Sequence, residues 1–197
     1  MYLEFISAKN AYIAASRRAF ACGLAAASGG NISVRIPGTD HMIVKPSGIT
    51  LGQAAEENLT IADLSGRLLE GERKPTKETI LHGGLYRFLP DTGAVVHLHP
   101  VSCMIVANCF DEMPLVTKQM KQITDRPVPV LKIKNNTVDE AGMAMIGALL
   151  KAQPGIPGFL LEEHGLVTFA KTAEDAENNA ELFEENARVF LGMRGLE

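Results

Sequence analysis

Several features that mark membrane or nucleic-acid-binding proteins are missing from this sequence. No apolar stretch reaches the roughly 18 residues that a membrane span requires. The first residues do not combine a basic segment with an apolar one, as a secretion signal does. The 19 Lys and Arg residues are scattered along the chain, which argues against a nucleic-acid surface. We therefore expect a cytoplasmic protein without a membrane or nucleic-acid partner.

Cysteine is also scarce, and internal repeats, low-complexity tracts and linkers are absent. The three cysteines (Cys22, Cys103 and Cys109) show no CxxC spacing, and an odd number is a poor disulfide framework. We expect free, buried thiols. The chain has 197 residues, of which 46 % are hydrophobic and 21 % charged, as in ordinary globular proteins. This length favours a single domain over residues 1–197.

Apolar periodicity and turn residues predict strands and helices that alternate along the chain. The expected helices cover about 5–27, 77–88, 101–108, 139–152 and 172–190, and the expected strands cover 32–36, 42–45, 58–63, 94–99, 128–131, 159–161 and 166–169. Thr76 suits the N-cap of the second helix. Pro129 suits a strand near a sheet edge, because proline cannot donate to a ladder. This interleaving predicts an α/β domain.

Two histidines close an apolar strand, and a third closes another. His97 and His99 are two residues apart, so both side chains lie on one face of an extended segment. Alone, this spacing more often marks a solvated or hydrogen-bonded pair. His164 precedes Gly165, which lets the backbone turn or approach another group closely. Three histidines with an open fourth position form a catalytic zinc site, so we predict one divalent metal ion here.

A glutamate and a fourth histidine lie on the helix predicted at 77–88. Glu78 is near its start, and a carboxylate beside a metal can bind the metal or move a proton. A glutamate in a first helical turn is also favourable for its charge alone. His82 lies one turn further on the same face. It is either a partner of the site or a plain surface or packing histidine.

Three turn segments have residues that suit a phosphate. Each offers backbone N–H groups, small side chains, hydroxyls or a predicted helix N-terminus, all of which favour anions. Singly, each is ordinary turn chemistry. The segments are Gly29-Gly30-Asn31, Ser47-Gly48 and Thr76-Lys77.

These blocks, in this order, resemble the class II aldolase/adducin family. The closest resemblance is to its zinc-dependent sugar-phosphate aldolases, such as L-fuculose-1-phosphate aldolase. The similarity runs from about residue 10 to about residue 190. The matching blocks are SGGNISVR at 28–35, KPSGI at 45–49, PTKE at 75–78 with His82, AVVHLHP at 94–100 and EHGL at 163–166.

The resemblance implies roles for individual residues. His97, His99 and His164 would hold one Zn²⁺ per subunit, or another divalent metal. Glu78 would be the catalytic acid/base and would also reach the metal when substrate is absent. The substrate phosphate would lie among Gly30, Asn31, Ser47, Gly48, Thr76 and Lys77.

The resemblance also implies a fold and an assembly. Family members are three-layer α/β/α sandwiches around a largely antiparallel sheet. They are usually homotetramers with active sites between subunits. The implied reaction is cleavage of a ketose 1-phosphate to dihydroxyacetone phosphate and an aldehyde, through a metal-stabilised enediolate that Glu78 protonates.

Two departures from the family pattern keep other activities open. Met120 follows Gln119 where the methylthioribulose-1-phosphate dehydratases carry a glutamate. Lys118 stands where the fuculose enzyme uses a tyrosine, and it is either a substitute in proton transfer or an exposed lysine. The alternatives are that dehydratase activity, a pentulose-phosphate 4-epimerase and, less favoured, a non-enzymatic domain that contains metal. The family also includes decarboxylases.

Overall fold

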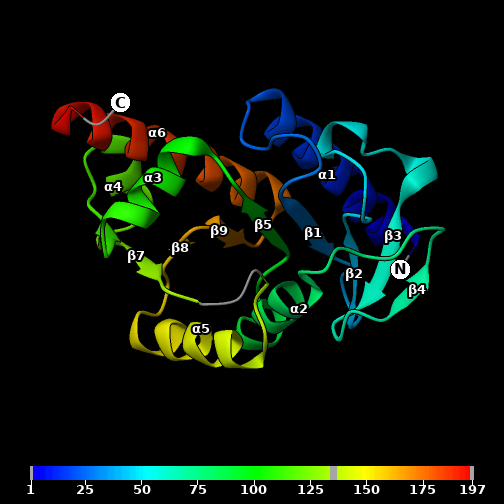
Figure 1. Cartoon of the computed structure of the whole chain (residues 1–197). Helices are drawn as coiled ribbons and strands as arrows, with labels where there is room; N and C mark the ends of the chain where they lie inside the picture. Colours follow the sequence, from blue (N-terminus) through cyan, green and yellow to red (C-terminus); the bar gives the residue numbers. More distant parts are fainter. Residues whose placement is uncertain (1, 134–136, 196–197) are drawn as a thin grey trace.

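Pairing of short strands builds the centre of the molecule. In the computed structural model, which describes residues 2–133 and 137–195, the strands form one nine-stranded sheet of order β4-β3-β2-β1-β5-β9-β8-β7-β6 (Figure 1). Among the described strands only β7 and β8 pair in parallel, so the sheet is largely antiparallel, as expected. The strands are β1 (Asn31–Arg35), β2 (His41–Val44), β3 (Thr60–Asp63), β4 (Leu68–Glu70), β5 (Ala94–Leu98), β6 (Glu112–Met113), β7 (Val128–Leu131), β8 (Gly158–Leu161) and β9 (Gly165–Ala170).

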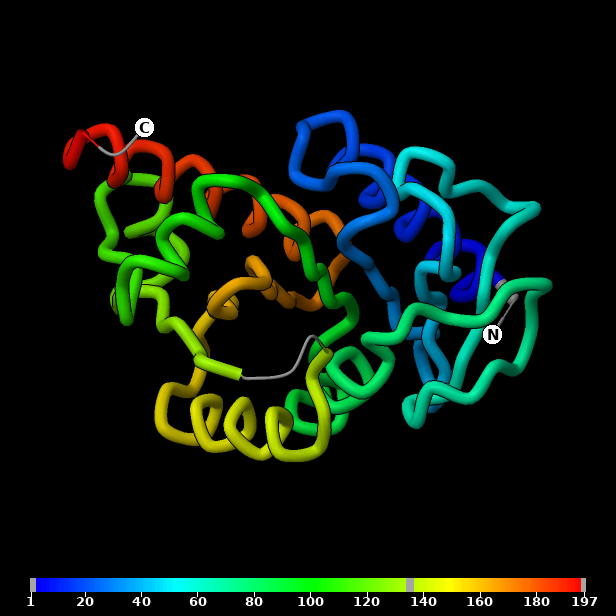
Figure 2. Tube along the Cα trace, viewed as in Figure 1, coloured from blue at the N-terminus to red at the C-terminus, as the bar shows by residue number. Residues whose placement is uncertain are grey.

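Helices cover both faces of the sheet. The helices are α1 (Tyr2–Ala21), α2 (Thr79–Phe88), α3 (Val101–Cys109), α4 (Lys118–Ile123), α5 (Glu140–Ala152) and α6 (Ala173–Arg194). The helices α1, α3 and α6 lie over one face of the sheet, and α2 and α5 lie over the other (Figures 1 and 2). One hydrophobic cluster joins the first group to the sheet, and a second joins the other group to it. The predicted three-layer α/β/α sandwich is therefore confirmed. No helix among the described residues is long and apolar enough to cross a membrane.

Alternation along the two central strands decides which side chains face which layer. On β5, Val96 lies in the cluster of α1 and α6, whereas Val95 lies in the cluster of α2 and α5. His97 therefore shares the face of Val95. On β1, Asn31 and Ser33 lie on that same face, where both hydrogen-bond to a side chain of α2. The polar residues of the central strands thus point toward α2.

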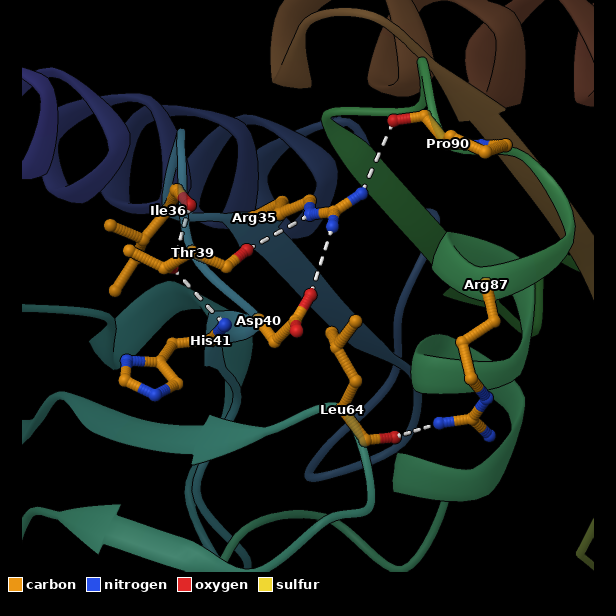
Figure 3. A network of polar contacts seen from close by, with 8 residues as sticks. All are labelled: Arg35, Ile36, Thr39, Asp40, His41, Leu64, Arg87 and Pro90. Carbon is orange, nitrogen blue, oxygen red and sulfur yellow. Dashed lines mark hydrogen bonds and ion pairs between the residues drawn. The ribbon is translucent and has the colours of Figure 1, made fainter.

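Two arginines hold loops in place beside α2 (Figure 3). Arg35, at the end of β1, donates to the carbonyl oxygen of Pro90 at 3.2 Å and lies 3.3 Å from a carboxylate oxygen of Asp40. Arg87, on α2, donates to the carbonyl oxygen of Leu64 in the turn between β3 and β4. These bonds fix α2 against the strands that it covers.

Several element boundaries differ from the prediction. α1 ends at Ala21 rather than near residue 27, although Leu24 and Ala25 continue the apolar pattern because they are buried without being helical. β3 begins at Thr60, after a short 3-10 turn over Glu56–Asn58. β4, β6 and α4 were not predicted, since segments of two to six residues carry little periodicity. β7, with its proline, lies one strand inside the sheet edge.

The prediction that Thr76 caps α2 is wrong. The helix begins at Thr79, and Glu78 occupies the N-cap position without a capping hydrogen bond from its side chain. The backbone N–H of Thr76 instead donates to the carbonyl oxygen of Lys45 at 2.9 Å. Tertiary pairing of the segment before the helix therefore overrides the local capping signal.

The expectation of buried thiols holds for one cysteine only. All three thiols are free, as predicted, but Cys22 and Cys109 are exposed and only Cys103 is buried. Cys103 points into the core from α3, whereas Cys22 follows the end of α1 and Cys109 ends α3. The number and spacing of the cysteines do not indicate which of them face solvent.

Candidate metal centre

Pairing of β5 with β9 brings the three histidines together. His97 lies on β5, His99 follows its end, and His164 lies in the turn between β8 and β9. The Nε2 atom of His97 is 3.1 Å from Nε2 of His99 and 3.2 Å from Nε2 of His164. Two ligands of a tetrahedral zinc ion, each about 2.0–2.1 Å from it, stand about 3.3 Å apart. The three ring nitrogens therefore converge at the spacing of a metal site.

The protonation state of the three rings suits metal binding. His97 donates its Nδ1–H to the carbonyl oxygen of Leu166 at 2.9 Å, which leaves the Nε2 lone pair facing the other two rings. Burial, then His99 and His164, holds the pKa of His97 well below its usual range. Burial also lowers the pKa of His99 to about 4 and lowers that of His164. Neutral imidazoles are the form that binds a metal ion.

The turn that carries His164 depends on a close backbone contact. Gly165 has a φ of +137°, and a Cβ atom there would lie 2.2 Å from the carbonyl oxygen of Leu98 and 3.0 Å from the Cα of His99. Only glycine fits both the conformation and the space. This contact is the physical reason for the His-Gly pair that the sequence shows.

Glu78 is buried, but it is not part of the histidine cluster. At this site, the described residues with ligand atoms within 4.8 Å of one another are His97, His99 and His164. The carboxylate of Glu78 does not meet this criterion. Glu78 accepts a long hydrogen bond of 3.5 Å from the backbone N–H of Val138. Burial raises its pKa to about 7, against the small opposing effect of that bond. A carboxyl group with this pKa can both give and take a proton near neutral pH.

The turn segments that the sequence predicts to bind a phosphate lie side by side. Backbone N–H of Ser47 donates to the carbonyl oxygen of Lys74 at 2.9 Å, and the Ser47 hydroxyl donates to that of Pro75 at 2.9 Å. The Lys45 ammonium donates to the carbonyl oxygen of Ser28 at 2.7 Å. The segments around residues 28, 47 and 76 therefore meet, although the sequence separates them.

The first of these segments also contacts the histidine strand. Gly30 has a φ of +68°, and a Cβ atom there would lie 3.0 Å from the carbonyl oxygen of His97. Asn31 is the ladder partner of His97 and is 5 % exposed. The candidate phosphate segments thus border the histidine cluster, with Ser47, Gly48 and Lys77 exposed and Thr76 half-buried.

Two buried residues near the site were given no definite role by the sequence. Lys45 is 4 % exposed, and no carboxylate among the described residues pairs with it; burial lowers its pKa. His82 is fully buried, which excludes a surface histidine and leaves the other two interpretations, a packing histidine or a partner of the site. Both are polar residues inside otherwise apolar stretches, and that signal could have drawn attention to them.

The segment that departs from the family pattern lies on α4. Lys118, its first residue, is exposed, and no hydrogen bond or ion pair among the described residues joins it to the histidines. Met120 is fully buried in the hydrophobic cluster of α1, α3 and α6. The position after Gln119 therefore offers no acid group.

Comparison with known proteins agrees with this arrangement. Residues 10–191 match the family described as Class II Aldolase and Adducin N-terminal domain. The chain belongs to this family. The match covers all the segments that build the histidine cluster and the neighbouring turns.

Relatives within the class II aldolase family have different activities. A methylthioribulose-1-phosphate dehydratase of Pseudomonas savastanoi pv. phaseolicola is 30 % identical over 192 residues, covering 93 % of this chain and 94 % of the relative. A 3-oxo-tetronate 4-phosphate decarboxylase of Haemophilus influenzae is 30 % identical over 195 residues, covering 96 % and 90 %. The L-fuculose-1-phosphate aldolase structure from Thermus thermophilus superimposes with a TM-score of 0.82 at 24 % identity, covering 96 % and 95 %, which shows the shared fold.

Proposed function

We propose that this protein is a metal-dependent carbon–carbon lyase that cleaves a ketose 1-phosphate to dihydroxyacetone phosphate and an aldehyde. The observation that carries the proposal is the convergence of three neutral imidazole nitrogens, 3.1–3.2 Å apart, beside turns suited to a phosphate. Membership of the class II aldolase family supports it.

The donor set fits one zinc ion. Imidazole nitrogens suit zinc, and three protein ligands leave a coordination position for substrate. His97, His99 and His164 would hold the ion. Glu78, whose carboxylate lies outside the histidine cluster, would have to turn toward the ion to act as a further ligand before substrate binds. When bound, zinc would supply a Lewis acid beside the substrate carbonyl and hydroxyl oxygens.

Glu78 would move the proton that the reaction requires. As the C3–C4 bond breaks, the C4 hydroxyl loses one proton and becomes the aldehyde carbonyl, and the enediolate that remains must take up one proton at C3 to give dihydroxyacetone phosphate. With a pKa of about 7, caused by burial, the carboxyl group of Glu78 can deliver that proton and recover it.

The anion-binding segments would hold the substrate phosphate. Their members are Gly30, Asn31, Ser47, Gly48, Thr76 and Lys77. The backbone N–H groups of Gly30 and Gly48, the amide of Asn31 and the hydroxyl of Thr76 would donate to the phosphate oxygens, and the exposed ammonium of Lys77 would add charge. The hydroxyl of Ser47 would join them by turning away from the carbonyl oxygen of Pro75. Holding the phosphate in this way would keep the reacting carbons in register with Glu78.

A second candidate is decarboxylation of a phosphorylated 3-oxo acid. The relative from Haemophilus influenzae favours it, as does the buried ammonium of Lys45, which lacks a carboxylate partner among the described residues. Loss of CO₂ would also break a carbon–carbon bond beside the carbonyl. Dehydration, which the Pseudomonas relative performs, is less favoured, because Met120 leaves the site without a second acid at that position.

One assay panel separates these activities. The zinc-loaded protein would be incubated with fuculose, rhamnulose, ribulose and methylthioribulose phosphates and with 3-oxo-tetronate 4-phosphate, and products identified by mass. Release of dihydroxyacetone phosphate supports the aldolase, and release of CO₂ supports the decarboxylase. Loss of water, epimerisation or no turnover at all contradicts the proposed lyase.

Two substitutions test the assigned roles, with an exposed histidine as the control. His97→Ala should lose most bound zinc, because it removes one of three ligands, whereas His41→Ala should keep it. Glu78→Gln should retain zinc and lose at least about a hundredfold in turnover, the lower range for a general acid/base. Metal content and kcat would be measured for each. Full zinc occupancy in His97→Ala would disprove the ligand assignment.

We also propose that the active enzyme is a homotetramer with sites between subunits, as the family resemblance implies. Sedimentation analysis of the purified protein tests this, since a monomer that retains full turnover would exclude it.

A further inference from the structure

Four buried side chains between α2 and β1 form a continuous chain of hydrogen bonds that ends at Asn31. The hydroxyl of Tyr86 is 2.8 Å from that of Ser33, which is 2.7 Å from Nδ1 of His82. The other ring nitrogen of His82, Nε2, contacts Oδ1 of Asn31. All four residues are at most 5 % exposed. His82 and Tyr86 are one helical turn apart, and Asn31 and Ser33 share one face of β1.

The chemistry of the four side chains decides which group donates and which accepts in each of these hydrogen bonds. Oδ1 of Asn31 can only accept, so Nε2 of His82 carries a proton and donates it. A neutral imidazole has one N–H, so Nδ1 accepts from the hydroxyl of Ser33, which in turn accepts from the hydroxyl of Tyr86. Burial lowers the pKa of His82 to about 3, which agrees with a neutral ring. Each hydrogen bond then has one donor and one acceptor, and no two donors face each other.

This direction fixes the amide of Asn31. Because Oδ1 is held toward α2, the Nδ2 amino group points away from His82. No hydrogen-bond acceptor for this amino group is found in residues 2–133 and 137–195. Asn31 is the ladder partner of His97 and follows Gly30, which lies against the same strand. A free donor therefore faces the region beside the histidine cluster, where an anion can accept from it.

We propose that His82 is a positioning residue for substrate phosphate. Supported by Ser33 and Tyr86, it holds the Asn31 amide so that its N–H₂ group, rather than its oxygen, faces the phosphate. A reversed amide would place a carbonyl oxygen against the phosphate oxygens, which repel it. The inference rests on the proposed function, from which it takes the phosphate site.

The first test needs no substitution. Nitrogen chemical shifts of the histidine rings, measured by NMR on the zinc-loaded wild-type protein, report the tautomer of His82. The neutral Nε2–H form is expected from about pH 6 to about pH 8, since burial keeps the ring uncharged. The Nδ1–H form, or a charged ring, would reverse the proton direction and overturn the proposal.

The second test compares binding of dihydroxyacetone phosphate with binding of dihydroxyacetone, which lacks the phosphate. His82→Leu should weaken binding of the phosphate ester about tenfold, as for loss of one hydrogen bond to a charged group. Zinc content and the affinity for dihydroxyacetone should stay unchanged. His82→Gln should restore part of the loss, because its amide nitrogen can replace Nε2 as a donor.

A double variant shows whether His82 acts through Asn31. Asn31→Ala with His82→Leu should bind dihydroxyacetone phosphate no more weakly than Asn31→Ala alone. Additive losses would mean that His82 acts by another route and would overturn the proposal. If His82→Leu does not fold, Ser33→Ala replaces it, and the proposal fails if its smaller loss adds fully to that of Asn31→Ala.

The outcomes also separate this inference from the proposed function. If Asn31→Ala leaves binding of dihydroxyacetone phosphate unchanged, the phosphate site itself is wrong, and both fail. If Asn31→Ala weakens binding and the His82 variants do not, the phosphate site stands and the positioning role of His82 is rejected.

Discussion

Among single residues, Glu177 on α6 is a buried carboxyl group in surroundings that are unfavourable for its charge. It is 1 % exposed, and the guanidinium of Arg18 reaches its carboxylate at 3.0 Å without the geometry of a hydrogen bond. Burial and then the neighbouring Glu181 raise the pKa of Glu177, whereas Arg18, 3.0 Å away, opposes them. The ionised form is thus penalised in the folded protein.

Glu177 therefore makes stability depend on pH in a defined direction. The pKa of Glu177 in the folded protein lies above the ordinary value of 4.5. Its contribution to the free energy of unfolding is therefore fully present below about pH 4.5 and is lost as pH rises through the folded pKa. Glu177→Gln should gain unfolding free energy relative to wild type between about pH 5 and about pH 8 in urea titrations. Glu185→Gln, exposed on the same helix, should not. If the difference in unfolding free energy between Glu177→Gln and wild type did not change with pH, the charge of Glu177 would not be penalised by burial.

Residues of the site differed in how well the sequence predicted them. Alternation along an extended segment was enough to place His97 and His99 together, and glycine after His164 indicated a close approach. The surroundings of His82 were not predictable, because they depend on which face of α2 meets β1. Glu78 was correctly expected at the start of a helix, but the sequence did not reveal its contact with the backbone of Val138.

At the scale of elements, α6 supplies side chains that cap other segments. The carboxylate of Glu184 accepts from the backbone N–H groups of Ser102 at 3.2 Å and Cys103 at 3.0 Å, in the first turn of α3. That helix begins directly after His99 and Pro100. Two donors that a helix start leaves without partners are thereby satisfied.

Removing this cap should weaken the fold. Glu184→Ala leaves two backbone N–H groups without an acceptor and should cost roughly 1–3 kcal/mol of unfolding free energy. Glu184→Gln keeps one oxygen as an acceptor and should lose less. Arg188→Ala removes only the exposed side of a 3.7 Å ion pair with Glu184 and should have little effect. Urea unfolding of the three variants provides the measurement, and equal losses in all three would exclude a capping role.

Short elements depend on such tertiary contacts, which explains why they escaped prediction. α4 has six residues, and its preceding residues are held by Asn186 of α6, which accepts from the N–H groups of Val116 and Thr117. Nothing in a local pattern of six residues indicates a partner on another helix. The long helices and buried strands carried enough periodicity to be recognised.

At the scale of the molecule, the histidine cluster joins segments that are distant in sequence. The sheet order β1-β5-β9 brings them together, and this order was not derivable from the alternation of elements. Alternation predicted the layers, since strands and helices must cover each other's apolar faces. The choice of neighbours in the sheet depends on the packing of the whole chain.

Metal binding should therefore stabilise the whole fold. A ligand that binds only the folded state adds about 4 kcal/mol at a thousand times its Kd, so zinc should raise the Tm and a chelator should reverse the gain. The effect should vanish in His97→Ala and persist in His41→Ala, as measured by thermal unfolding. An unchanged Tm for wild type on saturation with zinc would show that the cluster binds no zinc in the folded state.

The position of His97 within the sheet has a consequence for how a bound metal would leave. Its strand is paired on both sides, with Asn31 and Val167 as its ladder partners, whereas His99 and His164 lie just outside strands. Backbone paired on both sides moves only when the sheet opens, whereas side chains at strand ends rotate far more often. We expect the ion to dissociate in steps. His99 or His164 would be released from the ion first, and His97 would be the last ligand to leave it.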